Sequence, residues 1–278
     1  MRGYKSTISL TKNSRGIYSL DTTMGCTSGL KDNPKGCYND CYAAKSAKLY
    51  GYDFSKTVTR DFKDELHRRK IVMQISRIPL PFVRIGTMGD PSENWEHTVN
   101  VCEKIKHCNK EIVIITKHWT NLTDAQLEVF AGLNICINTS VSALDNPVLL
   151  ENSVAQYNRI KKYCKSVLRI VSCDFNIENK EGYELYKIQK KLFENDDILD
   201  TVLRVNKHNK LVKDGVINIK QVTFLGAKQY ASKYNKKTYL GKCSNCHEMC
   251  GVTMGENHEN RKGVIIQPTL FKLPVLKS

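Results

Sequence analysis

The stretch Glu111-Ile-Val-Ile-Ile-Thr116 carries the pattern that decides the fold. It is a short apolar run rich in β-branched residues, which favour strands, and it does not alternate with polar residues. Runs of the same kind recur at 16–20, 81–85, 134–138, 167–171 and 201–205. Most of them are separated by roughly twenty to thirty residues of mixed polarity, which is typical of buried parallel strands joined by helices.

Helices are expected at 95–106, 122–130, 147–162 and 184–193, between these runs. The first follows the turn-forming Asp90-Pro91-Ser92 and the third follows Asp145-Asn146, which is suited to capping. About six strand-then-helix units result, and they favour an α/β fold built as a (β/α) barrel or an incomplete (β/α)6 barrel. A doubly wound open sheet remains an alternative, because the sequence does not fix the strand order.

The chain is strongly basic, with 43 Lys and Arg against 28 Asp and Glu over 278 residues. We expect the barrel to occupy 1–206 and a basic extension with a second cysteine group to occupy 207–278. Between 207 and 242 there are nine lysines and a single acid, interleaved with Phe224, Tyr230, Tyr234 and Tyr239. This mixture is typical of surfaces that neutralise phosphates and stack bases, although a solvated lysine-rich face has the same composition.

Composition also excludes several classes of protein. A hydrophobic content of 41% is enough for a core, and no apolar run is long enough to span a bilayer. The N-terminus, Met1-Arg-Gly-Tyr-Lys-Ser6, lacks the apolar stretch of a signal peptide, so we expect a cytoplasmic protein without membrane contact. In a reducing cytoplasm, two tight cysteine groups indicate metal ligation more than disulfides. The remaining cysteines are expected to pack as apolar residues, at 102, 108, 136, 164 and 173.

The first cysteine group is Cys26, Cys37 and Cys41, in a loop that follows the first predicted strand. Zinc sites usually contain C-x2-C pairs and four ligands, whereas this loop has C-x10-C-x3-C spacing and no nearby histidine. Three thiolates can hold three irons of a cubane iron–sulfur cluster and leave the fourth iron open. Glycines at 25, 29 and 36 and a proline at 34 fit a loop that wraps closely around such a cluster.

The second group, Cys243, Cys246 and Cys250, has C-x2-C-x3-C spacing and needs a fourth ligand. His247 or His258 would complete a zinc site of the Cys3His type. An auxiliary iron–sulfur cluster is the alternative, with its last position filled by substrate, by water or by a distant cysteine such as Cys173. The sequence predicts a metal here and leaves its identity open.

The segment from Gly36-Cys37 to Cys41-Tyr42-Ala43, together with the late cysteine group, resembles the bacteriophage gene product 88 family. More broadly, the chain resembles the radical S-adenosylmethionine (radical SAM) superfamily, although the usual spacing there is C-x3-C-x2-C. The resemblance implies a barrel of radical SAM type, in which three cysteines bind a [4Fe-4S] cluster and S-adenosylmethionine (SAM) chelates the open iron. It also implies an electron donor such as flavodoxin or ferredoxin.

The same resemblance implies a set of cofactor contacts. The loop after the second strand, Gly86-Thr87-Met88-Gly89-Asp90, would contact the amino group of SAM, although a Gly-Asp pair before a helix is also ordinary turn and cap chemistry. Ser140 would contact the ribose and Arg169 the carboxylate. The full set of predicted cofactor residues is Gly86, Thr87, Gly89, Asp90, Ser140, Arg169 and Tyr42.

The leading hypothesis is therefore a radical SAM enzyme that abstracts hydrogen from a nucleic acid or nucleotide, as in a phage-type modification, in the host cytoplasm if the chain is phage-encoded. Two alternatives remain open. One is a non-catalytic nucleic-acid-binding protein whose metal sites staple its loops. The other is a radical SAM enzyme that modifies a peptide.

Overall fold

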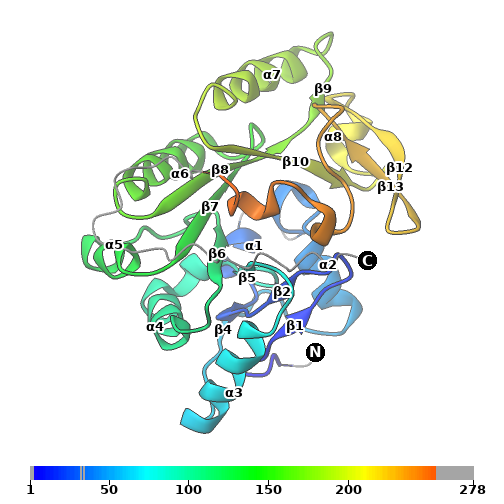
Figure 1. Ribbon diagram of the computed structural model, residues 1–278. Coiled ribbons are helices and arrows are strands. Elements are labelled where there is room, and N and C mark those ends of the chain that lie inside the picture. Colours follow the sequence, from blue (N-terminus) through cyan, green and yellow to red (C-terminus); the bar gives the residue numbers. More distant parts are fainter. Residues whose placement is uncertain (1–2, 32, 34, 255–278) are drawn as a thin grey trace, which may run out of the picture.

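The computed structural model describes residues 3–31, 33 and 35–254. Within these residues, the fold is a mixed α/β structure around a nine-stranded, mostly parallel sheet with the order β1-β2-β5-β6-β7-β8-β10-β13-β12 (Figure 1). The strands of this sheet are β1 (Thr11–Lys12), β2 (Tyr18–Ser19), β5 (Phe82–Ile85), β6 (Glu111–Thr116), β7 (Ile135–Val141), β8 (Lys165–Ser172), β10 (Ile198–Val205), β12 (Lys220–Phe224) and β13 (Ala227–Ser232).

The strands from β2 to β10 lie side by side in chain order, and each pairs in parallel with the next. All the predicted strand runs contain strands of this sheet. A doubly wound sheet reverses its strand order at a switch point, and no such reversal occurs among the described strands. Antiparallel strands form both edges of the sheet. Strand β1 pairs with β2 at one edge, and the β12–β13 hairpin pairs with β10 at the other.

The predicted helices correspond to α4 (Trp95–Ile105), α5 (Asp124–Ala131), α6 (Pro147–Ile160) and α7 (Lys180–Leu192). Helix α7 begins four residues earlier than predicted because the side chain of Asn179 caps it by accepting from the Gly182 N–H. The sequence analysis did not predict the other helices. They are α1 (Thr27–Lys31), α2 (Tyr42–Leu49), α3 (Glu65–Ser76) and α8 (Lys210–Lys213), with the 3-10 turns η1 (Cys37–Asn39), η2 (Pro91–Asn94), η3 (Cys243–Asn245) and η4 (Met249–Gly251).

Short strand pairs complete the described elements. Strand β3 (Thr23–Met24) pairs with β4 (Val58–Thr59), and β9 (Asp174–Phe175) pairs with β11 (Ile217–Asn218). The predicted extension from residue 207 contributes β12 and β13 to the central sheet, and its residues 255–278, including His258, lie outside the described part of the chain. No helix in the described ranges has both the length and the apolar character needed to cross a membrane.

Side chains alternate between the two faces of the central sheet, and each face has a buried apolar cluster. One face packs against α3, α4 and α5 through a cluster that includes Ile85, Ile114 and Ile137. The other face, called here the inner face, has an apolar layer at the N-terminal ends of the parallel strands. Fully burying one such side chain contributes about 1.5–3 kcal/mol, which makes these layers the main stabilising feature of the sheet. The residues of the inner layer are Ile17, just before β2, and the strand residues Phe82, Val113, Cys136, Val167 and Leu199.

Residues 243–252 cover that inner layer, and we call the layer and this segment together the floor (Figure 1). Cys243 and Cys250 pack in the same apolar cluster as the strand residues. Asn138 Nδ2 donates to the carbonyl of Cys250 at 3.0 Å, and the Cys243 N–H donates to the carbonyl of Arg15 at 2.8 Å. An added Cβ at Gly251 would lie 2.7 Å from Val167 Cγ2, so the segment packs tightly on the sheet. The floor closes the N-terminal end of the inner face.

The two edges of the central sheet contact each other through Arg15, which lies in the connection between β1 and β2. Its guanidinium lies over the ring of Phe224, at the end of β12, with 5.4 Å between Cζ and the ring centroid. Arg15 Nε also donates to the carbonyl of Gly241 at 3.0 Å. Residues near the two edges of the sheet therefore lie close together in space.

Candidate functional site

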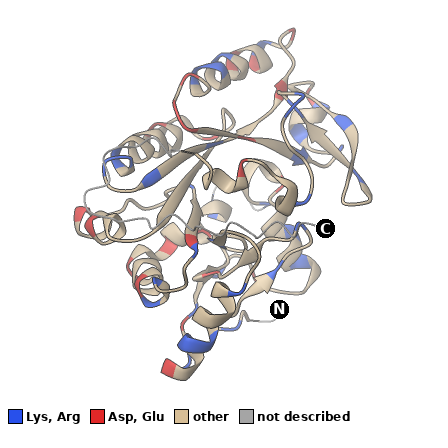
Figure 2. Cartoon of the chain, in the orientation of Figure 1, with Lys and Arg blue, Asp and Glu red and all other residues tan. Residues whose placement is uncertain are grey.

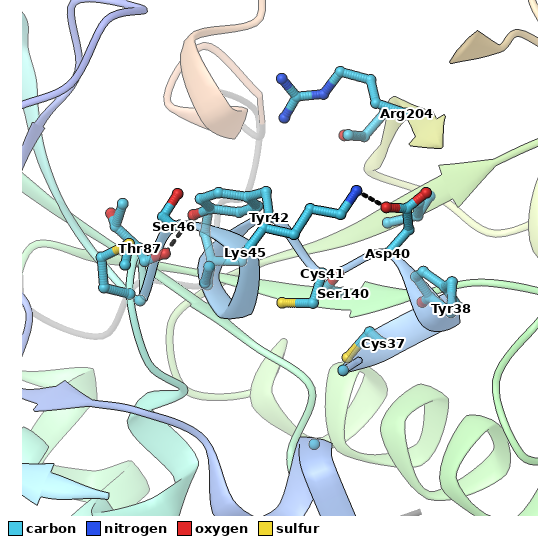
Figure 3. Close-up of a pocket in the computed structure, with 18 of the residues that line it drawn as sticks. Cys37, Tyr38, Asp40, Cys41, Tyr42, Lys45, Ser46, Thr87, Ser140 and Arg204 are labelled. Carbon is cyan, nitrogen blue, oxygen red and sulfur yellow. Dashed lines mark hydrogen bonds and ion pairs between the residues drawn. The ribbon is translucent and has the colours of Figure 1, made fainter. Parts of the chain in front are cut away.

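A cavity of about 1070 Å³ lies on the inner face, above the floor and toward the C-terminal ends of the parallel strands. Its volume matches the upper range of small-molecule sites, so there is room for an inorganic cluster and an organic cofactor together. Every residue predicted to hold the first cluster or the cofactor lines this cavity. These residues are Cys26, Cys37, Cys41, Tyr42, Gly86, Thr87, Gly89, Asp90, Ser140 and Arg169. Figure 3 labels five of them, Cys37, Cys41, Tyr42, Thr87 and Ser140.

Cys26 is held at the start of α1 by short contacts. The Gly29 N–H donates to Cys26 Sγ at 3.3 Å, and Cys26 Sγ donates to Glu93 Oε1 at 3.6 Å. Glu93 Oε1 also accepts from the Ser28 N–H at 2.8 Å, which ties the loop to η2. Burial, with the nearby Asp90 carboxylate, raises the pKa of the Cys26 thiol. A bound cation would reverse this effect, because it favours the thiolate.

Cys37 and Cys41 flank a turn in which Tyr38 has a φ of 58°, a conformation that few non-glycine residues adopt. The sulfur atoms of the two cysteines point the same way into the cavity (Figure 3). Burial raises the pKa of Cys37 to about 11, and the nearby Lys117 ammonium opposes that rise. Lys117 is thus placed to stabilise a thiolate at Cys37.

A buried polar network anchors this turn to the strands. Lys117, just after β6, lies 2.6 Å from Asp145 Oδ1, and both side chains are less than a tenth exposed. Tyr38 OH donates to the same oxygen at 3.0 Å and accepts from Lys117 Nζ at 2.7 Å. The network fixes the cysteine turn against the C-terminal ends of β6 and β7.

The loop after β5 packs closely against both the cysteine loop and its own sheet. The Gly25 N–H donates to the carbonyl of Met88 at 3.0 Å, and Tyr42 OH donates to the carbonyl of Thr87. Gly86 has a φ of +91°, and an added Cβ there would lie 2.2 Å from the carbonyl oxygen of Ile115. Only glycine fits this position, so the loop can pack directly against β6.

Two aspartates hold this loop. Asp21 Oδ1 accepts from the N–H groups of Gly86 and Thr87, at 3.1 and 2.6 Å. Asp90 accepts from Ser92 N–H, Thr116 Oγ1 and Lys117 N–H, at 3.0, 2.7 and 2.8 Å. Its carboxylate therefore performs the turn and cap chemistry that the sequence left open, and contact with a cofactor amino group stays a prediction.

The donor set can be tested against the metal that the sequence predicts. Within the described residues, no three Cys, His, Asp or Glu side chains gather closely enough to hold one metal ion. A zinc ion with Zn–S bonds of about 2.3 Å needs sulfur atoms within roughly 4 Å of one another. A cubane binds each thiolate on a different iron and spaces them more widely. The described residues therefore show no site for a lone tetrahedral ion at the first cysteine group, and a cubane there stays a prediction.

Space beside the thiols is compatible with such a cluster. An added Cβ would lie 2.8 Å from Cys26 Sγ at Gly29 and 2.5 Å from Cys41 Cβ at Gly36, so two glycines keep the loop open beside the sulfurs. Trp119 Nε1 is buried next to Cys26 and has no hydrogen-bond partner among the described residues. Such an orphaned donor facing a cavity indicates a site that is completed by a bound group.

The second cysteine group lies apart from the cavity lining. Cys243 and Cys250 are buried in the floor, and Cys246 is partly exposed. Neither candidate fourth ligand within the described ranges gathers with them, because His247 is exposed and Cys173 packs in a different cluster with Phe175. His258 lies outside the described residues. A metal at this group stays a prediction.

The basic stretch from 207 to 242 is only partly as predicted. Its lysines are mostly exposed around the β12–β13 hairpin (Figure 2). The aromatic residues are less available for stacking: Phe224 is 4% exposed, and Tyr234 packs against Phe193 with 5.2 Å between ring centroids. They stabilise the hairpin and its neighbours, so this stretch presents charge more than stacking surfaces.

Sequence reasoning missed several residues of the site, namely Arg15, Asp21, Arg84, Glu93, Asp145 and Arg204. A signal for two of the arginines was present, because Arg84 and Arg204 interrupt apolar strands in the segments Phe82-Val-Arg-Ile85 and Val202-Leu-Arg-Val205. A charge inside a buried strand needs a partner or a ligand. A scan against protein-family models found no match, and no curated protein matches the chain.

Proposed function

We propose that the chain is a radical SAM enzyme in which Cys26, Cys37 and Cys41 hold a [4Fe-4S] cluster and SAM binds in the adjoining cavity. One observation carries the proposal. The three cysteines and the seven predicted cofactor residues come from distant parts of the chain, yet all line one cavity toward the C-terminal ends of parallel strands. That end is where β/α folds place their chemistry.

The architecture is consistent with an incomplete (β/α)6 barrel of radical SAM type. The parallel strands follow one another in chain order, as they do in barrels. The contact between Arg15 and Phe224 supports a sheet curved far enough for its edges to meet. A doubly wound sheet has an open cleft where its strand order reverses, and the order of the described parallel strands does not reverse.

When bound, the cluster and SAM would supply the electron transfer and bond cleavage that amino acid side chains cannot perform. The chain itself would bind and orient the reactants. Gly86 and Gly89 let the loop that would contact the cofactor pack against β6 and the cysteine loop, while Asp21 holds that loop in place. Arg169 offers its guanidinium to the cofactor carboxylate, and Ser140 offers its hydroxyl to the ribose.

The remaining residues would tune and shelter the site. Lys117 opposes the rise in the Cys37 pKa and so favours the thiolate that a cluster needs. The floor closes the inner end of the cavity, which excludes water from that side. For the second group, Cys243, Cys246 and Cys250, the proposal keeps both an auxiliary iron–sulfur cluster and zinc.

For the substrate we propose a nucleic acid or nucleotide, with flavodoxin or ferredoxin as electron donor. Support comes from charge: among the described residues that line the cavity, eight are Lys or Arg and three are Asp. A basic cavity attracts phosphate groups.

The exposed lysines of the β12–β13 hairpin favour a second candidate, a non-catalytic nucleic-acid-binding protein whose metal sites staple its loops. In that case polynucleotide binding would weaken steeply with salt and SAM would not bind. Polynucleotide affinity that is weak and unchanged by neutralising Lys233, Lys236 and Lys237 would instead point to a peptide substrate.

Anaerobic reconstitution with iron and sulfide tests the leading proposal. We expect about four irons and a visible absorption band from the first site. Both should be lost in a Cys26/Cys37/Cys41 triple alanine variant and kept in a control that replaces the core residues Cys102 and Cys108. Dithionite and SAM should then release 5′-deoxyadenosine. A loaded cluster without this product would remove the catalytic claim, and zinc in place of iron would remove the cluster.

A further inference from the structure

Arginines from three parallel strands and one edge connection converge on the cavity. Arg84 (β5), Arg169 (β8), Arg204 (β10) and Arg15 all line it, and we call them the arginine group. Arg84 is 8% exposed and the other three are half-buried. Figure 3 shows the guanidinium of Arg204 extending over the cavity. Four guanidiniums at one site form a strong local concentration of positive charge.

The arginine group is only partly balanced by negative charge, since the Asp21 carboxylate interacts electrostatically with Arg84 alone among its members. Among the described residues, none of its members forms an ion pair with a carboxylate. The three aspartates that line the cavity are engaged elsewhere: Asp21 with backbone N–H groups, Asp40 with Lys45, and Asp90 with Ser92 and Thr116. The remaining charge of the group is therefore available to a ligand.

Many guanidinium donors in the group are also unused. Among the described residues the guanidinium of Arg204 makes no hydrogen bond. That of Arg15 uses only Nε, and that of Arg84 uses Nε and one terminal nitrogen on Thr87 Oγ1. An arginine has five N–H donors in a planar fork that matches the oxygens of a phosphate. None of these donors is sealed in the protein without a partner, so a ligand in the cavity with several oxygens can reach them.

The members of the group also repel one another. Burial, together with neighbouring guanidiniums, lowers the pKa of Arg169 and of Arg204. Both side chains remain charged at neutral pH, because a guanidinium loses its proton only at very high pH. The fold therefore holds like charges close together, an arrangement that an anion stabilises.

The depth of the group limits the shape of the ligand. Arg84 and Arg169 lie two residues beyond Phe82 and Val167 on the same strands, and therefore one layer above the closed floor. A phosphate must therefore enter the cavity as far as this layer to reach Arg84, which is 8% exposed. A terminal phosphate of a small molecule can do so, whereas a phosphodiester inside a polymer is flanked by chain on both sides.

We propose that Arg15, Arg84 and Arg204 bind the terminal phosphates of a free nucleoside di- or triphosphate, with the half-exposed ring of Tyr42 in the same cavity available to its base. The inference rests on the proposed function in two respects: Arg169 is left to the carboxylate of SAM, and Tyr42, one of the predicted SAM residues, also serves the nucleotide base. A competing role for the arginines is to neutralise the thiolates of Cys243 and Cys250, which are close enough to influence their charge.

Calorimetry on the full chain without SAM tests the proposal. The probes are pyrophosphate, ADP, adenosine and an oligonucleotide without terminal phosphates. We expect ADP and pyrophosphate to bind and the other two probes not to bind. Arg84→Gln and Arg204→Gln should each weaken pyrophosphate binding at least tenfold. Arg77→Gln, an exposed control outside the cavity, should leave it unchanged. Arg84→Lys serves as the conservative variant, and circular dichroism confirms that each variant is folded.

Three binding results would each overturn the proposal. They are adenosine binding as tight as ADP binding, oligonucleotide binding that needs the same arginines, and no pyrophosphate binding by folded protein. A fourth is loss of metal from the second cysteine group in Arg84→Gln with unchanged pyrophosphate affinity, which would assign the arginines to the thiolates. The Cys26/Cys37/Cys41 triple alanine variant should still bind pyrophosphate, so failure of the radical chemistry and failure of this inference remain distinguishable.

Discussion

The guanidinium carbon of Arg15 lies 5.4 Å from the centroid of the Phe224 ring, and that of Arg204 lies 4.8 Å from the same centroid. Arg15 belongs to the connection at one edge of the central sheet and Phe224 to the strand at the other edge. The ring therefore joins the two edges and sets the spacing of two cavity arginines. Each cation–π contact contributes about 0.5–2 kcal/mol, depending on its exposure to water.

Replacing Phe224 should test both roles of this ring. Phe224→Ala is expected to lower the free energy of unfolding by about 3 kcal/mol or more, because the ring is 4% exposed. Phe224→Leu keeps most of the apolar volume and should cost about 1 kcal/mol, yet weaken pyrophosphate binding by misplacing Arg15 and Arg204. Urea denaturation and calorimetry measure the two effects. Wild-type pyrophosphate affinity in Phe224→Leu would contradict the positioning role.

The buried pair of Lys117 and Asp145 should be sensitive to loss of one partner. Asp145→Asn leaves the Lys117 ammonium without its carboxylate, so we expect a loss of about 3–5 kcal/mol in the free energy of unfolding. A Lys117→Met/Asp145→Leu double variant should be less destabilised than either single variant, since it leaves no buried charge. The exposed pair of Lys210 and Asp214 is the control, and Asp214→Asn should have no measurable effect. Equal effects of the two aspartate substitutions would contradict the argument.

Gly86 offers a test of the loop after β5. Gly86→Ala places a Cβ 2.2 Å from the carbonyl oxygen of Ile115 at a φ of +91°, so the loop must shift. We expect SAM affinity to fall more than tenfold while iron content is unchanged, as measured by equilibrium dialysis and iron analysis. Gly132→Ala is the matched control, because its φ is −84° and its nearest neighbour would lie 3.5 Å away. Full SAM affinity in Gly86→Ala would exclude a SAM contact at this loop.

His118 gives a prediction about pH. Burial lowers the pKa of His118 to about 3, and its Nε2 lies 3.0 Å from Thr139 Oγ1. The unfolded chain protonates this histidine near pH 6.5, so stability that is present above pH 6.5 is lost as the pH falls toward 3. The loss is on the order of 4 kcal/mol at pH 3. Denaturation from pH 7 to 4 should show a shallower decline for His118→Gln than for the wild type. Parallel declines would mean that His118 does not contribute.

The sequence predicted the strands well because buried parallel strands are continuous apolar runs, such as 111–116 and 167–171. It also predicted that the first cysteine group lies close to the loop at 86–90, because the C-terminal ends of parallel strands lie at the same end of the sheet. It did not predict the partners of Lys117, since Asp145 and Tyr38 are distant in sequence and meet only through strand register. The arginines were missed because the runs that contain them were interpreted as core alone.

The position of the second cysteine group was equally beyond the sequence. Its spacing indicated a metal site, but the packing of Cys243 and Cys250 against Val113 and Val167 depends on contacts across the whole sheet. Asn138 takes part in this packing through a hydrogen bond to the carbonyl of Cys250, which no local sequence motif predicts.

The floor has a consequence for biosynthesis. A ribosome delivers the N-terminal parts of a chain first, so every parallel strand emerges before residues 243–252 can pack on them. Until then residues 243–252 do not cover Phe82, Val113 and Val167. A chain released before residue 243 would expose these side chains to solvent as an apolar patch that promotes aggregation. Premature termination close to the end of translation should therefore yield aggregates rather than a slightly shortened native protein.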